Sequence, residues 1–172
     1  MSAGDQQRAI LRLLNRGPVR GKKKLQKLLY FVQEAEREPL GFDYRMHYYG
    51  PYSPTLDSRV RALSHAGLVE SSTSGEGTSS FSIAKDVAES LAGRHEPLDE
   101  KIDRVSSRLG DQTPNTIELL GTIHFLVSSW GRVDEGRMGT LVDQIRAWKG
   151  SKYTRTQIEG GVKRLQGWGY VK

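Results

Sequence analysis

Residues 50–70 read GPYSPTLDSRVRALSHAGLVE, and the order of signals within them decides the fold. Ser53 followed by Pro54 predicts a helix start, because serine caps free N–H groups and proline fits the first helical position. Apolar residues then recur at helical spacing, at Leu56, Val60 and Leu63. Gly67 permits the left-handed turn that ends a helix, and Leu68 opens a strand. The stretch therefore predicts a turn, a helix, a glycine exit and a strand.

The segments on either side extend this pattern. Two helices are expected before it, one ending at Gly17-Pro18 and one in GKKKLQKLLYFVQEAER, residues 21–37. FDYRMHYYG predicts a strand over roughly 42–49, with the rings of Tyr48 and Tyr49 on opposite faces at its end. A polar turn, STSGEGTSS, and a returning strand, SFSIAK, follow. The order helix, helix, strand, helix, strand, turn, strand predicts a winged helix-turn-helix domain over residues 1–84.

The remainder of the chain is predicted to be helical. Residues 85–112 are expected to form a helical connector, and residues 113–172 a helical C-terminal half. The apolar stripe of the middle helix in that half is predicted at Met138, Leu141, Val142, Ile145 and Trp148. VRALSHAGLVE at 60–70 aligns with VKRLQGWGYVK at 162–172, at an offset of 102 that places Gly67 opposite Gly169. This repeat predicts a second helix-turn-helix-like unit, with independent use of the same turn chemistry as the alternative. The expected fold class is mainly α with a small β component.

The composition excludes several classes of site. The 172 residues contain no cysteine, which excludes disulfides, thiolate zinc sites and a cysteine nucleophile. No apolar run approaches the roughly 20 residues of a membrane span, and the N-terminal segment lacks the apolar core of a signal peptide. A cytoplasmic protein without membrane contact is therefore expected.

The charge is positive and unevenly distributed. The formal net charge is +6. Residues 1–70 carry 12 Lys and Arg against 7 Asp and Glu, residues 71–112 carry 5 against 8, and residues 113–172 carry 9 against 5. Basic surfaces attract polyanions, so nucleic acid is a candidate partner; a merely basic, solvated surface is the alternative.

Motifs for catalysis or metal binding were not found. The four histidines are more than five residues apart, so none forms a local metal pair: His47, His65, His95 and His124. The sequence has no phosphate-binding loop, dinucleotide fingerprint, nucleophile elbow or HExxH zinc motif. Adjacent acidic pairs point in different directions on a helix and are typical of a solvated surface. No catalytic residue, metal or cofactor is predicted, and the chain is not expected to be an enzyme.

Nucleic-acid contacts are the better supported chemistry. In a winged helix the third helix usually enters the major groove, which makes helix 53–66 the candidate reader. Its predicted contact residues are Thr55, Ser58, Arg59, Arg61 and His65. The predicted backbone-positioning residues are Arg20, Lys22, Lys23, Lys24 and Lys27. The stretch YYGPYS mainly predicts a strand-to-helix joint, but free N–H groups at the helix start could also bind a phosphate near Tyr49, Tyr52 and Ser53. The predicted wing, residues 71–80, carries no Lys or Arg, so protein recognition by the same scaffold is the alternative.

Several motifs resemble a known family. KKKLQKLLYFVQ, HYYGPYS and the helix-Gly-Leu-Val that follows closely resemble the YwgA family of uncharacterised bacterial and archaeal proteins. IELLGTIHFL and IEGGVKRLQGWGYV are similar to the C-terminal part of those proteins. More distantly, KLQKLLYF followed by YGP resembles the Panacea domain of SocA-like antitoxins. The resemblance implies a helix-turn-helix-like, regulator-like fold, and in the antitoxin relatives it implies binding of a protein toxin or an adaptor role in proteolysis.

Two functions are therefore expected from the sequence. The first is a winged-helix, transcription-regulator-like protein whose partner is DNA. The alternative is a protein-binding adaptor or antitoxin-like module, including one in defence against foreign DNA, whose partner is a toxin or a protease. Neither is enzymatic. A homodimer is a further expectation, with the two halves acting as a pseudo-dimer as its alternative.

Overall fold

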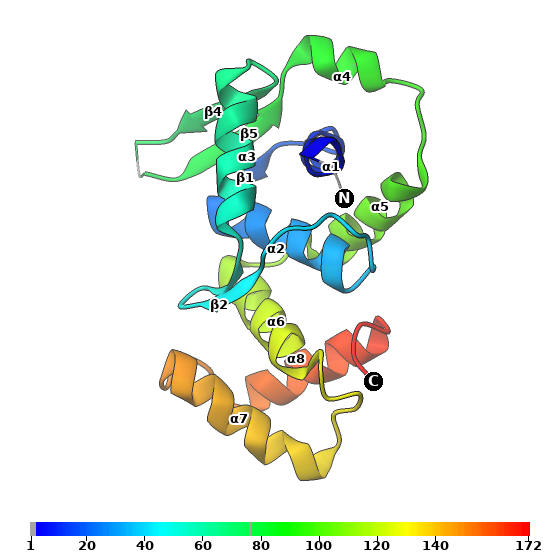
Figure 1. The fold of residues 1–172 in the computed structure, drawn as a ribbon. Helices are drawn as coiled ribbons and strands as arrows, with labels where there is room; N and C mark the ends of the chain where they lie inside the picture. Colours follow the sequence, from blue (N-terminus) through cyan, green and yellow to red (C-terminus); the bar gives the residue numbers. More distant parts are fainter. Residues whose placement is uncertain (1–2, 76) are drawn as a thin grey trace. The chain divides into compact units, whose positions relative to one another are not determined.

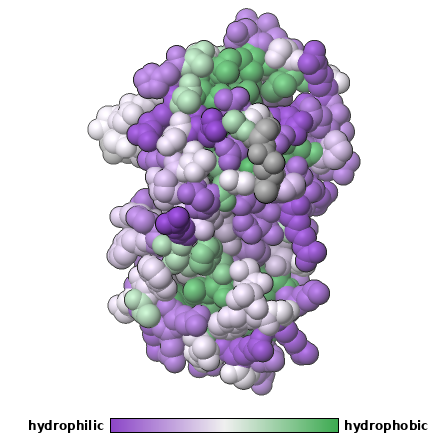
Figure 2. All heavy atoms as spheres, viewed as in Figure 1, coloured by the Kyte–Doolittle hydropathy of each residue, from purple (hydrophilic) through white to green (hydrophobic). Residues whose placement is uncertain are grey.

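The computed structural model describes residues 3–75 and 77–172. Within these residues the chain is mainly helical with a small antiparallel sheet, as predicted (Figure 1). It divides into two compact units: the first comprises the chain up to Arg45 together with Tyr52–Gln112, and the second comprises Met46–Pro51 and Thr113–Lys172. Hydrophilic side chains cover most of the face seen in Figure 2, and apolar side chains gather in separate patches. No helix in the described part of the chain is long and apolar enough to cross a membrane.

Among its described residues, the first unit consists of five helices and a three-stranded sheet. Its helices are α1 (Ala3–Leu14), α2 (Lys22–Glu34), α3 (Pro54–His65), α4 (Lys85–Leu91) and α5 (Pro97–Leu109). Its sheet has the order β1 (Val19–Arg20), β5 (Ser79–Ile83), β4 (Val69–Thr73). Both pairings are antiparallel, with Phe81 of β5 opposite Val19 on one side and Ser71 on the other. The region 85–112, expected as a connector, supplies α4 and α5, and α5 contacts α1 and α2.

The stretch that decides the fold forms the predicted elements. Ser53 caps α3, because its hydroxyl oxygen accepts the N–H of Leu56 at 3.2 Å. Gly67 has a φ of 72°, and the N–H of Leu68 closes the helix end on the carbonyl of Leu63 at 2.9 Å. The apolar stripe of α3 is buried, and it packs with α1 and β4. The predicted helix, glycine exit and strand are therefore confirmed.

The strand predicted over residues 42–49 is wrong in its extent. Two short strands form instead, β2 (Arg45–His47) and β3 (Gly50–Tyr52), and Tyr48 and Tyr49 lie in the turn between them. Gly50 takes a φ of 83°, which glycine adopts without steric cost. The backbone before β2 is held by a side chain of α2 rather than by a sheet ladder, since the N–H of Phe42 donates to Gln33 Oε1 at 2.8 Å. Local aromatic alternation therefore indicated a longer strand than the tertiary contacts allow.

The second unit is built on three helices, α6 (Pro114–Val127), α7 (Glu135–Lys149) and α8 (Arg155–Gly167). Helices α6 and α8 approach closely at Gly161, where an added Cβ atom would lie 2.5 Å from Ile123 Cδ1. Glycine at this position therefore sets the distance between the two helices. The N–H of Val133 donates to the carbonyl of Lys172 at 2.7 Å, which joins the segment before α7 to the segment after α8.

The sequence repeat has a counterpart in backbone geometry. In α8 the N–H of Tyr170 donates to the carbonyl of Leu165 at 2.9 Å, which matches the bond that closes α3. Gly169 has a φ of 74°, close to that of Gly67. Thr154 caps α8 as Ser53 caps α3. Both helices therefore begin with a side-chain cap and end with the same glycine turn.

Candidate nucleic-acid interface

One face of α3 is exposed to solvent. The exposed residues recur with helical spacing, at Ser58, Arg61, Ala62 and His65, and Thr55 is half-buried beside them. The opposite face carries the buried stripe, so periodicity alone predicted which side of the helix is open. Arg59 lies at the border of the two faces, and its Nε donates to Gln6 Oε1 of α1 at 3.0 Å. Arg59 therefore ties α3 to α1, and in this position it does not project as the predicted base reader.

A polar cluster lies at the start of α3 and centres on Asp57. The Asp57 carboxylate accepts the Tyr52 hydroxyl at 2.7 Å and the Gln26 side-chain N–H at 3.2 Å, and it forms an ion pair with Lys22. Burial by itself would raise the pKa of Asp57, but the hydrogen bonds from Lys22 and Tyr52 lower it overall. Burial, together with the Asp57 hydrogen bond, raises the pKa of Tyr52 to about 12. Asp57 is therefore ionised at neutral pH, and Tyr52 is a neutral donor.

A second carboxylate, Asp43, occupies the N-cap region itself. Its Oδ1 accepts the Ser53 hydroxyl at 2.7 Å and the N–H of Thr55 at 3.4 Å, and the bond from Ser53 lowers the pKa of Asp43. Ser53 is fully buried, and its own N–H donates to Gln26 Oε1 at 3.0 Å. The N–H groups predicted to bind a phosphate near Tyr52 and Ser53 are thus engaged within the chain. Two carboxylates with lowered pKa values, Asp43 and Asp57, lie beside them, and negative charge there disfavours a phosphate.

The predicted lysine cluster does not form one patch. Lys22 turns toward Asp57, whereas the ammonium group of Lys24 donates to the backbone carbonyl of Gly110. Lys27 was predicted as a DNA backbone contact, but it is buried, with 2% of its surface exposed, and is not part of an exposed basic patch. Lys23 and Arg20 are exposed. Residues one and two positions apart on a helix point to different sides, which is why the run Lys22, Lys23 and Lys24 divides.

The second unit holds a buried charged group that the sequence did not indicate. Glu118 of α6 lies 2.9 Å from Lys149 Nζ and 2.9 Å from Lys152 Nζ, and it accepts the Tyr153 hydroxyl at 3.1 Å. The side chains of Lys149 and Glu118 are 0% and 8% exposed. Burial would raise the pKa of Glu118, but the two lysines lower it overall. The predicted stripe of α7 included Trp148, yet Trp148 is 45% exposed and its neighbour Lys149 is buried instead.

The buried lysine also reaches the turn between β2 and β3. Lys149 Nζ donates to the backbone carbonyl of Tyr48 and lies 5.4 Å from the centre of the Tyr48 ring. Tyr49, named from the sequence as a phosphate contact, lies in the same turn and is 37% exposed. Its ring packs edge-on against Tyr48, with 5.0 Å between the ring centres. Tyr49 therefore belongs to the second unit and not to the polar cluster at the start of α3.

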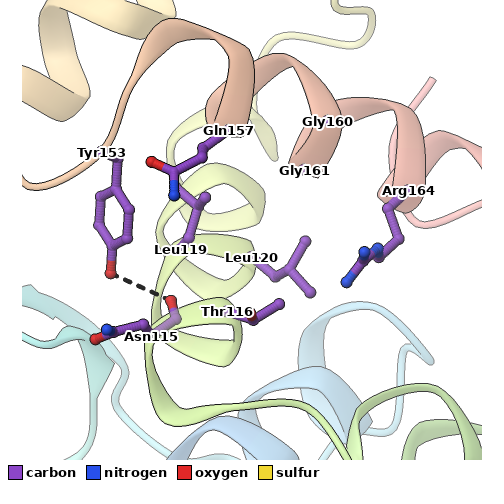
Figure 3. A pocket seen from close by; sticks show the side chains of 9 residues that line it. All are labelled: Asn115, Thr116, Leu119, Leu120, Tyr153, Gln157, Gly160, Gly161 and Arg164. Carbon is purple, nitrogen blue, oxygen red and sulfur yellow. Dashed lines mark hydrogen bonds between the residues drawn. The ribbon is translucent and has the colours of Figure 1, made fainter.

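A cavity of about 280 Å³ lies beside this charged group, between α6 and α8. Figure 3 shows Gln157 and Arg164, both from α8, toward opposite ends of it, and Tyr153 donating to the carbonyl of Asn115 at 3.2 Å. The remaining lining residues are Thr116, Leu119, Leu120, Gly160 and Gly161. Gln157 Oε1 accepts the N–H of Thr154 at 2.9 Å, so this oxygen is part of the helix cap.

Titratable groups elsewhere do not assemble a metal site. Among residues 3–75 and 77–172, no group of three or more His, Asp or Glu side chains is placed to hold a metal ion. Burial lowers the pKa of His124 to about 4, so this histidine is neutral in the folded chain at pH 7.

Comparison with known proteins shows that the chain is similar in sequence to part of an enzyme. No family model matches the chain. It is 30% identical over 151 residues to a DNA ADP-ribosyl glycohydrolase of Thermus aquaticus. The match covers 84% of this chain, and the chain spans 41% of the length of that relative.

This similarity corrects the functional expectations drawn from the sequence. A relative named for an enzyme overturns the expectation that the chain has no enzymatic function, and with it both the regulator-like DNA binder and the antitoxin-like adaptor. The labels winged helix, YwgA-like and Panacea-like gain no support from the similarity. Sequence motifs could not have indicated this, because no catalytic signature occurs in the chain. The chain is thus similar to a protein named DNA ADP-ribosyl glycohydrolase, and the similarity covers less than half of that protein's length.

Proposed function

We propose that this chain functions in the enzymatic removal of ADP-ribose from DNA, and that its share of the reaction includes holding the DNA. The similarity to a DNA ADP-ribosyl glycohydrolase over 84% of the chain carries the proposal. The chain spans 41% of the length of that relative, so the proposal assigns it a share of the reaction.

The charge of the chain supports contact with such a substrate. DNA is a polyanion, and an attached ADP-ribose adds two further phosphates. The chain has a net charge of +6, and the first unit exposes Arg20, Lys22, Lys23 and Arg61. Cations of this kind bind phosphates in a way that depends on salt and little on sequence.

The exposed face of α3 suits close approach to a nucleic-acid backbone. Ser58 and Ala62 are small and exposed, and Arg61 lies between them in sequence. Arg61 is near enough to Tyr52 to lower the pKa of its hydroxyl in opposition to Asp57. We therefore assign Arg61 to a phosphate of the DNA, with Ser58 and His65 on the same face.

The two carboxylates at the start of α3 are assigned to structure. Glycoside hydrolysis needs a group that donates a proton to the leaving atom and a group that activates water. The lowered pKa values of Asp43 and Asp57 make both poor proton donors at neutral pH. Their oxygens are engaged by Ser53, Tyr52 and Lys22. Their role in the proposal is to fix α3 and orient Lys22.

For the architecture, we infer that the first unit is a winged helix-turn-helix and the second a helix-turn-helix-like unit. The order α1, β1, α2, α3, β4, β5 and the sheet order β1-β5-β4 support the first inference. The matching ends of α3 and α8 support the second. This inference concerns architecture and carries no function by itself.

The test uses an oligonucleotide that carries ADP-ribose on one base. Release of ADP-ribose is followed by gel mobility and mass spectrometry, and binding by fluorescence anisotropy over a range of salt concentrations. Arg61→Ala is expected to weaken binding and to lower the salt slope by about 1. Lys85→Ala removes an equal charge from a side chain that is 90% exposed on α4, and is expected to leave binding unchanged.

The outcomes separate the parts of the proposal. Release of ADP-ribose by the chain alone would place the chemistry on its own residues. Binding without release would limit its share to holding the DNA. If the chain neither binds the oligonucleotide nor releases ADP-ribose at low salt, the proposal is overturned.

A further inference from the structure

We propose that the turn at Tyr48 and Tyr49 of the second unit, together with His47 at the end of β2, is a stacking platform for the unpaired bases of single-stranded DNA. The proposal deepens the proposed function, on which it rests, by naming the form of DNA that the chain holds. It concerns residues of the second unit alone: the turn, Glu118 of α6, Lys149 at the end of α7 and Lys152 after it.

The turn presents aromatic rings to solvent. Tyr48 is 58% exposed and Tyr49 is 37% exposed, which makes them two of the three large hydrophobic side chains that are exposed in the described part of the chain. The Tyr48 and Tyr49 rings meet edge-on at 5.0 Å, and the His47 ring lies 6.1 Å from Tyr49 at an interplanar angle of 33°. Exposed aromatic faces are the feature on which single-stranded nucleic-acid binders stack bases.

The backbone of the turn is held in place by the buried, charged side chain of Lys149. Lys149 Nζ donates to the Tyr48 carbonyl, and the whole Lys149 side chain is buried against Glu118. Removing a lysine and a carboxylate from water is unfavourable unless their geometry is well satisfied. The buried Lys149–Glu118 pair therefore fixes the backbone of a turn whose tyrosine rings are exposed. A turn that is already ordered loses less conformational entropy when a base stacks on it.

The charge beneath the turn favours a polyanion over a neutral or acidic partner. Glu118 is the single carboxylate of the group, and it faces both Lys149 and Lys152, which leaves an excess of one positive charge. The Lys152 side chain is 31% exposed. Residues 113–172 as a whole carry 9 Lys and Arg against 5 Asp and Glu. Cations beside aromatic rings are the combination that tracks a phosphate backbone while bases stack.

The chemistry of the substrate explains why unpaired bases are the ligand. An enzyme that acts on a base cannot reach it inside a duplex, so it uses single-stranded DNA or a base taken out of the stack. Tyrosine and histidine rings offer a surface to any base, because every base has a flat π face. In a duplex those faces are covered by neighbouring base pairs. The platform therefore discriminates by strand state and not by sequence.

The experiment compares two fluorescein-labelled DNAs, an unmodified oligo-dT of about 20 nucleotides and the same strand paired with oligo-dA, by anisotropy at low salt. Three chains are compared: the natural chain, Tyr48→Ala/Tyr49→Ala and Tyr48→Phe/Tyr49→Phe. The alanine variant is expected to lose affinity for the single strand by about tenfold or more. The phenylalanine variant retains the rings and is expected to bind as the natural chain does. Duplex binding is expected to change in neither variant, and thermal melts verify that all three chains are folded.

Three results would overturn the platform. These are unchanged single-strand binding by the alanine variant, an equal loss on the duplex, and an equal loss in the phenylalanine variant. If the natural chain binds duplex or releases ADP-ribose but does not bind oligo-dT, the platform fails and the proposed function stands. If it neither binds DNA nor releases ADP-ribose, the proposed function itself has failed.

Discussion

Arg12 of α1 and Asp99 of α5, 87 residues apart in the sequence, form an ion pair in which both side chains are almost completely buried, at 4% and 1% exposed. Arg12 also donates to Glu96 at 2.6 Å and to the carbonyl of Arg94 at 3.0 Å. This group joins the first helix of the chain to the segment that begins α5.

Asp99→Asn is expected to destabilise the chain by about 3–5 kcal/mol, because it leaves the buried Arg12 charge without its closest carboxylate. The free energy of unfolding from urea denaturation measures the effect. Asp103→Asn is the matched control, since Asp103 is 53% exposed and pairs with Arg16. Loss of such a pair changes stability by about 1 kcal/mol or less. Equal effects of the two variants would contradict the importance of burial here.

Gly161→Ala is expected to be less stable than Gly160→Ala by about 1–3 kcal/mol. The added Cβ at Gly161 would lie 2.5 Å from the fully buried Ile123 side chain, which must move within a packed core. At Gly160 no atom lies within 4 Å of an added Cβ, so alanine there stabilises α8 by about 0.5–1 kcal/mol. The two adjacent substitutions have identical chemistry, and thermal or urea denaturation compares them directly. A Gly161→Ala chain as stable as Gly160→Ala would show that α6 and α8 are not closely packed.

Stability should fall as the pH is lowered from 6.5 toward 4, in part because of His124. Burial depresses the pKa of this histidine from 6.5 to about 4, so between these values the unfolded chain binds a proton that the folded chain does not. The contribution is fully present above pH 6.5, and roughly 3 kcal/mol is lost by pH 4. Urea denaturation at several pH values gives the slope. His124→Gln should flatten the slope whatever it does to the stability at pH 7, and an unchanged slope would refute the assignment.

Lys149→Met is expected to loosen the turn at Tyr48 and Tyr49 without unfolding the second unit. Methionine keeps much of the length and apolar stem but removes the hydrogen bond to the Tyr48 carbonyl and the ion pair with Glu118. Glu118 retains Lys152 as a cationic partner, so its charge is not left unpaired. A hydrogen bond from a charged group contributes about 1.5–3 kcal/mol, so the amide hydrogens of residues 46–50 should exchange tenfold faster or more. Hydrogen exchange measured by mass spectrometry resolves this segment. Lys152→Met leaves the Tyr48 bond intact, and it should not accelerate exchange in the turn.

Local signals in the sequence predicted the parts of the fold that depend on neighbouring residues. Ser53 and Pro54 start α3, and Gly67 ends it, because caps and left-handed turns are satisfied within a few residues. The exposed face with Ser58, Arg61 and His65 followed from helical periodicity in the same way. These features need no knowledge of distant contacts.

Features that depend on distant contacts were not predictable. Lys27 and Lys149 are buried and Trp148 is exposed, although residue type favours the reverse in each case. The carboxylate of Asp43 reaches Ser53 through a loop that no periodic pattern describes. The enzymatic context rests on similarity to another protein, since the residues of the chain carry no catalytic motif.

The two carboxylates at the start of α3 also have a consequence for selectivity among anions. A helix start usually attracts small anions, such as sulfate or free phosphate, to its exposed N–H groups. Here Asp43 and Asp57 already neutralise that positive potential. Free phosphate in the cell therefore finds no competing binding site at this helix start, and side chains along the flank of α3 remain available to an extended polymer.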